Sequence, residues 1–67
     1  MKTEFNVKGM TCKACEMLID EALEDVGAAS VSSDHATGRV VVEHEESLTA
    51  DSMKRVIAEE GFEAERP

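Results

Sequence analysis

The 67 residues can form one small domain, because a chain of this length cannot bury a second hydrophobic core. The formal net charge of −8 argues against nucleic acid as a partner, since nucleic-acid binders present basic patches. No apolar run approaches the roughly 20 residues of a membrane span, and residues 1–9 lack the apolar core of an export signal. We therefore expect a cytoplasmic protein without direct membrane insertion, whose acidic surface gives solubility or docks a basic partner.

The first half of the chain predicts a strand followed by an amphipathic helix. Residues 3–8 alternate polar and apolar, with Phe5 and Val7 on one face, which is typical of a half-buried strand. Gly9 breaks this pattern, and apolar residues then recur at steps of three and four up to Gly27, which is expected to end the helix. The residues expected on the buried face of this helix are Cys15, Leu18, Ile19, Ala22, Leu23 and Val26.

The middle of the chain predicts two strands joined by a tight turn. Residues 28–34 contain Val31 among small polar residues and predict a weak strand. The sequence HATG at 35–38 is typical of a turn, and residues 39–45 form the clearest strand because they are rich in β-branched side chains.

The last third predicts a second helix and a short closing strand. Thr49 is expected to cap the start of the helix, with Leu48 and Met53 placed to pack together as a hydrophobic staple. The helix should end at Gly61, and residues 62–66 should form the final strand. Its inward-facing residues are expected to be Met53, Val56 and Ile57.

This order of elements, βαββαβ, predicts a single α+β domain over residues 1–67 with the ferredoxin-like fold. In that sandwich, a four-stranded antiparallel sheet in the order 4-1-3-2 carries both helices on one face. Following the chain through this topology brings residues 9–14, 35–38 and 61–62 to one end of the sheet. His44 is expected at the opposite end.

The sequence GMTCKAC contains both cysteines of the chain, Cys12 in the predicted loop and Cys15 at the start of the first helix. The positive end of a helix and the neighbouring Lys13 favour a thiolate, which is the form that binds metal or attacks disulfides. Glu16 opposes this effect, weakly if its side chain is exposed. A purely structural role for Cys15 would leave the exposed Cys12 unexplained.

Zinc and redox chemistry both fit less well than a two-thiolate metal site. Structural zinc needs four ligands, and the remaining candidates, His35 and His44, lie at spacings that match no zinc finger. His35 is expected to be a solvated turn residue. Thioredoxin-like chemistry also uses CxxC, but the only proline is Pro67, so no cis-proline loop can lie beside the thiols. Soft thiolates select Cu(I), which accepts two sulfur ligands.

GMTCKAC within this βαββαβ pattern resembles the heavy-metal-associated domain family, and the resemblance spans nearly the whole chain. The family includes copper chaperones, N-terminal domains of copper-transporting P-type ATPases and mercury-binding MerP proteins. The resemblance implies that Cys12 and Cys15 are the metal ligands, that Met10 packs into the core, and that Phe62 lies beneath the metal loop. Thr11 matches the copper-type motif.

Three residues depart from the usual pattern of this family. Glu16 occupies a position that is commonly apolar or small, and Ser33 and His35 occupy positions that are often apolar. These departures leave the ligands untouched, but they leave the packing of the second strand open.

The resemblance implies a soluble Cu(I) metallochaperone that carries copper on the CxxC dithiolate and passes it by ligand exchange to a copper-transporting P-type ATPase or a related metal-binding domain. No catalytic pair or phosphate loop appears, so no enzyme activity is expected. Hg(II), Zn(II) and Cd(II) remain open as other soft cargo. Two alternatives remain: an N-terminal metal-binding domain of such an ATPase, and a CxxC thiol-redox protein. The length from Met1 onward favours a free-standing carrier, expected to be a monomer or a metal-bridged dimer.

Overall fold

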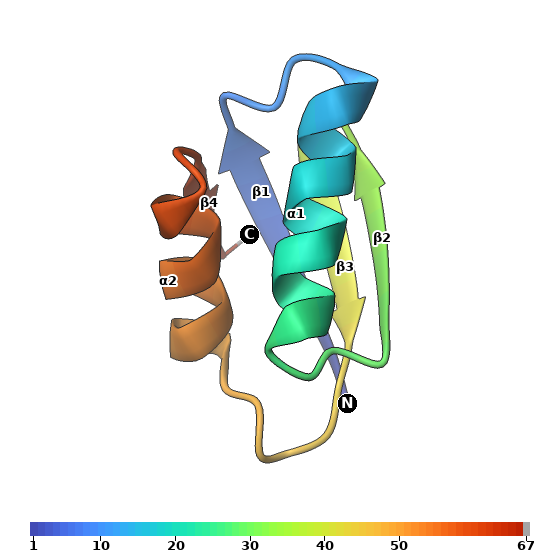
Figure 1. Ribbon diagram of the computed structural model, residues 1–67, viewed down its shortest axis with the longest axis vertical. Helices are drawn as coiled ribbons and strands as arrows, with labels where there is room; N and C mark the ends of the chain where they lie inside the picture. The colour runs from blue at the N-terminus through green and yellow to red at the C-terminus, as the bar shows by residue number, and fades with distance from the viewer. Residues whose placement is uncertain (67) are drawn as a thin grey trace.

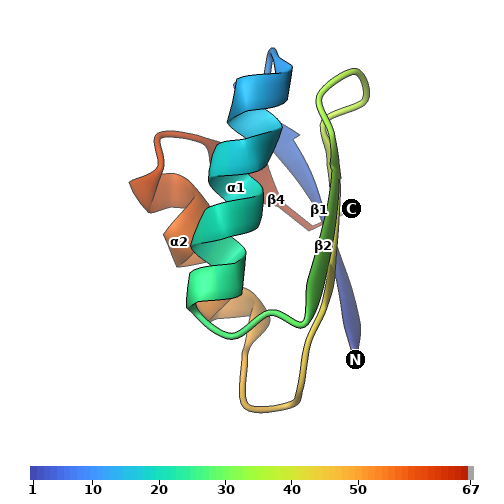
Figure 2. The same cartoon turned by 45° about the vertical axis from the view of Figure 1, so that its right-hand side comes forward.

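The computed structural model describes residues 1–66 and contains a four-stranded antiparallel sheet. Figure 1 and Figure 2 show both helices on the same face of this sheet. The strand order β2-β3-β1-β4 is the predicted order seen from the other edge, so the ferredoxin-like fold is confirmed. Neither helix within these residues has the length and apolar character needed to cross a bilayer. The elements are β1 (Lys2–Lys8), α1 (Lys13–Asp25), β2 (Ser30–Asp34), β3 (Arg39–Glu43), α2 (Ala50–Glu59) and β4 (Glu63–Glu65).

Several element ends differ from the prediction for local reasons. Helix α1 begins two residues earlier, because the backbone carbonyl of Cys12 already accepts hydrogen bonds from the amides of Cys15 at 3.1 Å and Glu16 at 3.4 Å. Strand β3 stops at Glu43 rather than at residue 45, because Glu43 pairs with Lys2, the first residue of β1. Strand β1 begins at Lys2, so the ladder between β1 and β3 cannot continue past Glu43.

The hydrophobic core lies between the sheet and the two helices. On α1, Ile19 and Leu23 are fully buried, whereas Leu18 and the C-cap residue Val26 are 46% and 42% exposed. The prediction that these two face the core was wrong, because the sheet and α2 cover a narrower stripe of α1 than the apolar pattern suggested. The buried apolar residues are Phe5, Val7, Met10, Ile19, Leu23, Val40, Val42, Leu48, Met53, Ile57 and Ala64.

The ends of the helices follow the predicted signals. The Thr49 hydroxyl accepts a hydrogen bond from the Ser52 amide at 3.2 Å and caps α2. Leu48 and Met53 are both buried, as expected for a staple across this cap. Gly27 follows α1 with φ +111°, a backbone conformation that glycine adopts without strain.

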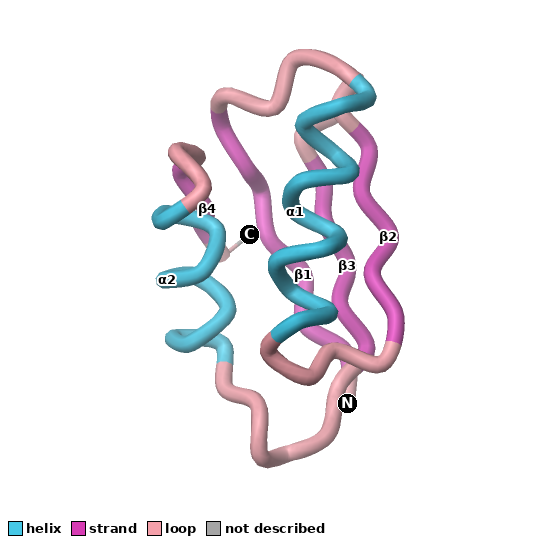
Figure 3. The backbone as a smooth tube through the Cα atoms, viewed as in Figure 1, coloured by secondary structure: helices cyan, strands magenta, loops and turns pink. Residues whose placement is uncertain are grey.

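Three connections lie toward one end of the sheet, as predicted: β1 to α1, β2 to β3, and α2 to β4 (Figure 3). The β2–β3 hairpin is tied to β1, because the Val7 amide donates a hydrogen bond of 2.7 Å to the carbonyl of Gly38. A Cβ atom at residue 38 would lie 2.8 Å from the Val7 carbonyl oxygen, so this close approach requires glycine.

His44 lies at the other end, where its backbone exchanges hydrogen bonds with Met1. The whole residue is only 5% exposed. Nδ1 donates to the carbonyl of Glu45 at 2.8 Å, and Nε2 pairs with the hydroxyl of Thr3 at 2.7 Å. Both ring nitrogens therefore have structural partners far from the cysteine loop.

Candidate metal centre

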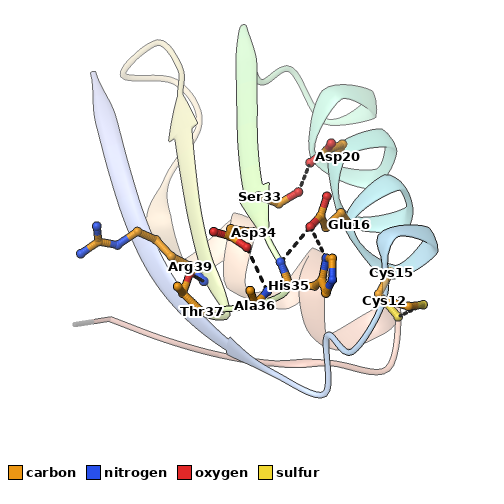
Figure 4. A network of polar contacts seen from close by, with 10 residues as sticks. All are labelled: Cys12, Cys15, Glu16, Asp20, Ser33, Asp34, His35, Ala36, Thr37 and Arg39. Atoms are coloured by element: carbon orange, nitrogen blue, oxygen red, sulfur yellow. Dashed lines mark hydrogen bonds and ion pairs between the residues drawn. The ribbon is translucent and has the colours of Figure 1, made fainter.

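The two cysteines lie together at the start of α1. Cys12 is the N-cap residue in extended conformation, and Cys15 follows in the first helical turn. Their sulfur atoms are 3.4 Å apart and form no disulfide (Figure 4). Cys12 is exposed and Cys15 is partly buried. One thiol thus faces solvent on the loop while the other is held by the helix.

The surroundings of Cys15 favour its thiolate. Hydrogen bonding from the backbone at Thr11, then from the Cys12 thiol, lowers the pKa of Cys15, against an opposing effect of desolvation. The Cys12 backbone adds to the same effect. The predicted direction is therefore confirmed for this residue. The main cause is the loop backbone rather than Lys13.

The cysteine loop is supported from below by apolar side chains. Met10 is 4% exposed and belongs to the hydrophobic core, as expected from its place in the motif. Phe62 is half-buried against the same core. A Cβ atom at Gly9 would lie 3.5 Å from Cδ1 of Phe62, so the ring contacts the start of the loop. These contacts fix the base of the loop and leave Cys12 at its surface.

Among the described residues, no histidine or carboxylate joins the two thiols as a third ligand. Within residues 1–66, no His, Asp or Glu ligand atom forms a group of three with the sulfurs in which all atoms lie within 4.8 Å of one another. His44 lies at the opposite end, and His35 pairs with a carboxylate instead. The geometry offers a metal ion two sulfur ligands from one chain.

One expectation about the neighbourhood was wrong. Glu16 was expected to be exposed, but its side chain is only 13% exposed and bonds to His35. His35 lies in the turn with its side chain 40% exposed, as expected. Glu16 Oε2 accepts the His35 amide at 2.8 Å and lies 2.6 Å from His35 Nδ1 (Figure 4). The His35 backbone amide first, then its ring, lowers the pKa of Glu16. The pair joins α1 to the β2–β3 hairpin.

A second polar contact lies beside this pair. Ser33 Oγ donates to Asp20 Oδ1 at 2.9 Å. The three departures from the family pattern therefore take part in polar contacts between α1 and the β2–β3 hairpin, which shows how β2 is held against the helix. A signal was present in the sequence: Glu16 and Asp20 are one helical turn apart, and Ser33 and His35 are two residues apart where the strand meets the turn.

Comparison with known proteins gives the family. The model of the heavy-metal-associated domain matches residues 4–63. A mercuric reductase of Lysinibacillus sphaericus is 33% identical over 63 residues, which cover 94% of this chain but only 12% of that enzyme. The copper chaperone CopZ of Staphylococcus aureus (strain JH9) is 33% identical over 61 residues, covering 88% of this chain and 90% of CopZ.

The structural comparison agrees. A crystal structure of a copper-binding domain from HMA7, a P-type ATPase, superposes with a TM-score of 0.93 and 32% sequence identity. The match covers 98% of this chain and 92% of that domain. The family model covers most of the chain, and both the sequence and the fold agree with it. The chain belongs to the heavy-metal-associated domain family.

Proposed function

We propose that this chain is a cytoplasmic Cu(I) carrier that holds one ion between Cys12 and Cys15. The observation that carries the proposal is a pair of free thiols 3.4 Å apart at an exposed helix start, with no His, Asp or Glu ligand atom within 4.8 Å of both sulfurs among residues 1–66. Soft thiolates favour Cu(I), and Cys12 on the loop can move away from Cys15 to admit the ion. The proposal includes no catalysed reaction.

The proposed partner is another metal-binding domain, such as that of a copper-transporting P-type ATPase. The likeness to the copper chaperone CopZ supports this chain as the donor of the ion, and the likeness to a copper-binding ATPase domain supports a domain of the same fold as the acceptor. The same likeness supports the alternative that this chain is itself the metal-binding domain of an ATPase. The length of the encoded protein distinguishes the two.

Hg(II) is the second candidate cargo. The likeness to a mercuric reductase covers 94% of this chain, and Hg(II) is also a soft ion suited to two thiolates. A carrier of Hg(II) would use the same two residues. The thiol-redox alternative would instead use them to exchange disulfides.

Transfer follows from the different exposure of the two thiols. An incoming partner thiolate bonds to the ion from the side of Cys12, giving a three-sulfur intermediate in which one metal–sulfur bond then breaks. This parallels thiol–disulfide exchange, which also passes through a shared intermediate. No free Cu(I) is released along this route.

The experiment compares Cys12→Ser with Cys15→Ser. Each variant is mixed with Cu(I) and a partner CxxC domain, and the complex is measured by size-exclusion chromatography and NMR titration. Cys12→Ser should abolish the metal-bridged complex, because no exposed thiolate remains. Cys15→Ser should hold the ion less tightly but still form some complex. Equal bridging by both variants would contradict the proposed order of transfer.

A further inference from the structure

A second group of metal-binding side chains lies beside the cysteine loop. Glu16 comes from the first turn of α1, Asp34 from the end of β2, and His35 from the first position of the hairpin. One ligand atom from each lies within 4.8 Å of the others. Figure 4 shows Glu16 and His35 facing each other between α1 and the hairpin, with the Asp34 carboxylate beside them turned toward Ala36. We call these three residues the hairpin cluster.

We infer that the hairpin cluster is a second metal site, which binds one divalent ion of borderline softness such as Zn(II). Imidazole nitrogen and carboxylate oxygen are both ordinary zinc ligands. Two carboxylates offset the charge of a divalent ion, and the imidazole of His35 adds the nitrogen that a purely acidic surface lacks. The donor set therefore differs in kind from the two thiolates.

Glu16 is already held in position to act as a ligand. Its side chain is 13% exposed, and its Oε2 accepts the backbone amide of His35 at 2.8 Å. That backbone bond can persist when an ion is bound, because a carboxylate oxygen accepts more than one partner. A ligand fixed in this way loses little conformational freedom on binding.

The ion would take the place of a proton. Nδ1 of His35 lies 2.6 Å from Glu16 Oε2, a separation that a shared hydrogen spans. Zinc–nitrogen and zinc–oxygen bonds of about 2.0–2.2 Å need these two atoms to separate by a further fraction of an ångström. The proton leaves to solvent, and Nδ1 and the carboxylate then bond to the ion.

Asp34 supplies the third ligand without losing its present role. Its Oδ1 accepts the amide of Ala36 at 2.9 Å, which holds the turn. The other carboxylate oxygen, Oδ2, would become the ligand once the side chain rotates toward Glu16 and His35. The exposed side of the cluster leaves a fourth position for water.

The test uses Co(II), a spectroscopic substitute for Zn(II), and the full chain carrying Cys12→Ser and Cys15→Ser. Removing both thiols separates this site from the proposed copper site, so the two can fail independently. We expect one Co(II) per chain with visible absorption but no sulfur-to-metal charge-transfer band. Paramagnetic broadening in NMR spectra should centre on Glu16, Asp34 and His35.

His35→Gln in the same background is the decisive variant, since glutamine can still bond Glu16 but offers no imidazole. Co(II) affinity should fall about tenfold or more, with thermal unfolding checked to confirm the fold. Asp25→Asn at the far end of α1 is the matched control and should bind as before. Equal Co(II) affinity in both variants, or broadening centred elsewhere on the acidic surface, would overturn the inference.

Discussion

Met10 lies within the metal-binding motif, yet its side chain belongs to the core. It is 4% exposed, so Met10→Ala should lower the free energy of unfolding by about 2–5 kcal/mol. Met10→Leu conserves volume and should cost less than about 1.5 kcal/mol. Urea denaturation measures both. Loss of Cu(I) binding in a folded Leu variant would instead make Met10 a ligand.

Glu16 should make stability depend on pH. Its pKa is lowered in the folded protein from the ordinary value of 4.5, first by the His35 amide. A lowered pKa stabilises the fold above the ordinary pKa, and this contribution is lost as the pH falls through the lower folded value. The difference in unfolding free energy between wild type and Glu16→Gln should therefore be largest near neutral pH and shrink in acid.

Urea unfolding of both proteins over that pH range measures the difference. Glu21→Gln is the control, because Glu21 is exposed on the same helix. A difference that grows as the pH falls would contradict the role assigned to the Glu16–His35 pair.

The residues of the site differ in how far the sequence alone predicts them. Cys12, Cys15 and Met10 share one short motif, so their places follow from local order. Glu16 and His35 are 19 residues apart, and their contact exists only once α1 packs against β2. Each was interpreted separately as an exposed residue. Pairing them requires the tertiary structure.

At the scale of elements, Gly38 is the residue on which the hairpin depends. Its φ is +76°, and an added Cβ would lie 2.8 Å from the Val7 carbonyl oxygen. Gly38→Ala should therefore destabilise the fold by about 1–3 kcal/mol. Gly27→Ala is the matched control, with φ +111° but no atom within 4 Å of the added Cβ. It should cost less in the same denaturation experiment.

Helix α1 shows where pattern alone is insufficient. Six positions fit an apolar face, but only Ile19 and Leu23 are fully buried. The width of a buried stripe depends on which neighbours cover the helix, and periodicity does not contain that information. By contrast, the cap at Thr49 was predicted well, because the signal is local.

For the Gly38 prediction, the contradicting result would be a Gly38→Ala protein as stable as Gly27→Ala. That result would show that the hairpin can move away from β1.

At the scale of the whole molecule, the order of elements was enough to predict the topology. Strands separated by helices and one short hairpin leave few arrangements, and the βαββαβ order favours the one observed. That topology brings the cysteine loop and the β2–β3 hairpin to the same end. It therefore places the two thiols and the hairpin cluster beside each other, although they come from different parts of the chain.

Cu(I) should be the preferred ion of Cys12 and Cys15. The chain is first loaded with one Cu(I) and then exposed to excess Zn(II) in the presence of a strong Cu(I) chelator of known affinity. The copper that stays bound to the chain is then measured. Two thiolates without a third ligand should retain Cu(I) against Zn(II), which favours four ligands. Zinc taken up elsewhere would leave the copper count unchanged. Displacement of Cu(I) from the thiols by Zn(II), or failure to bind Cu(I) together with an oxidising dithiol potential, would contradict the account.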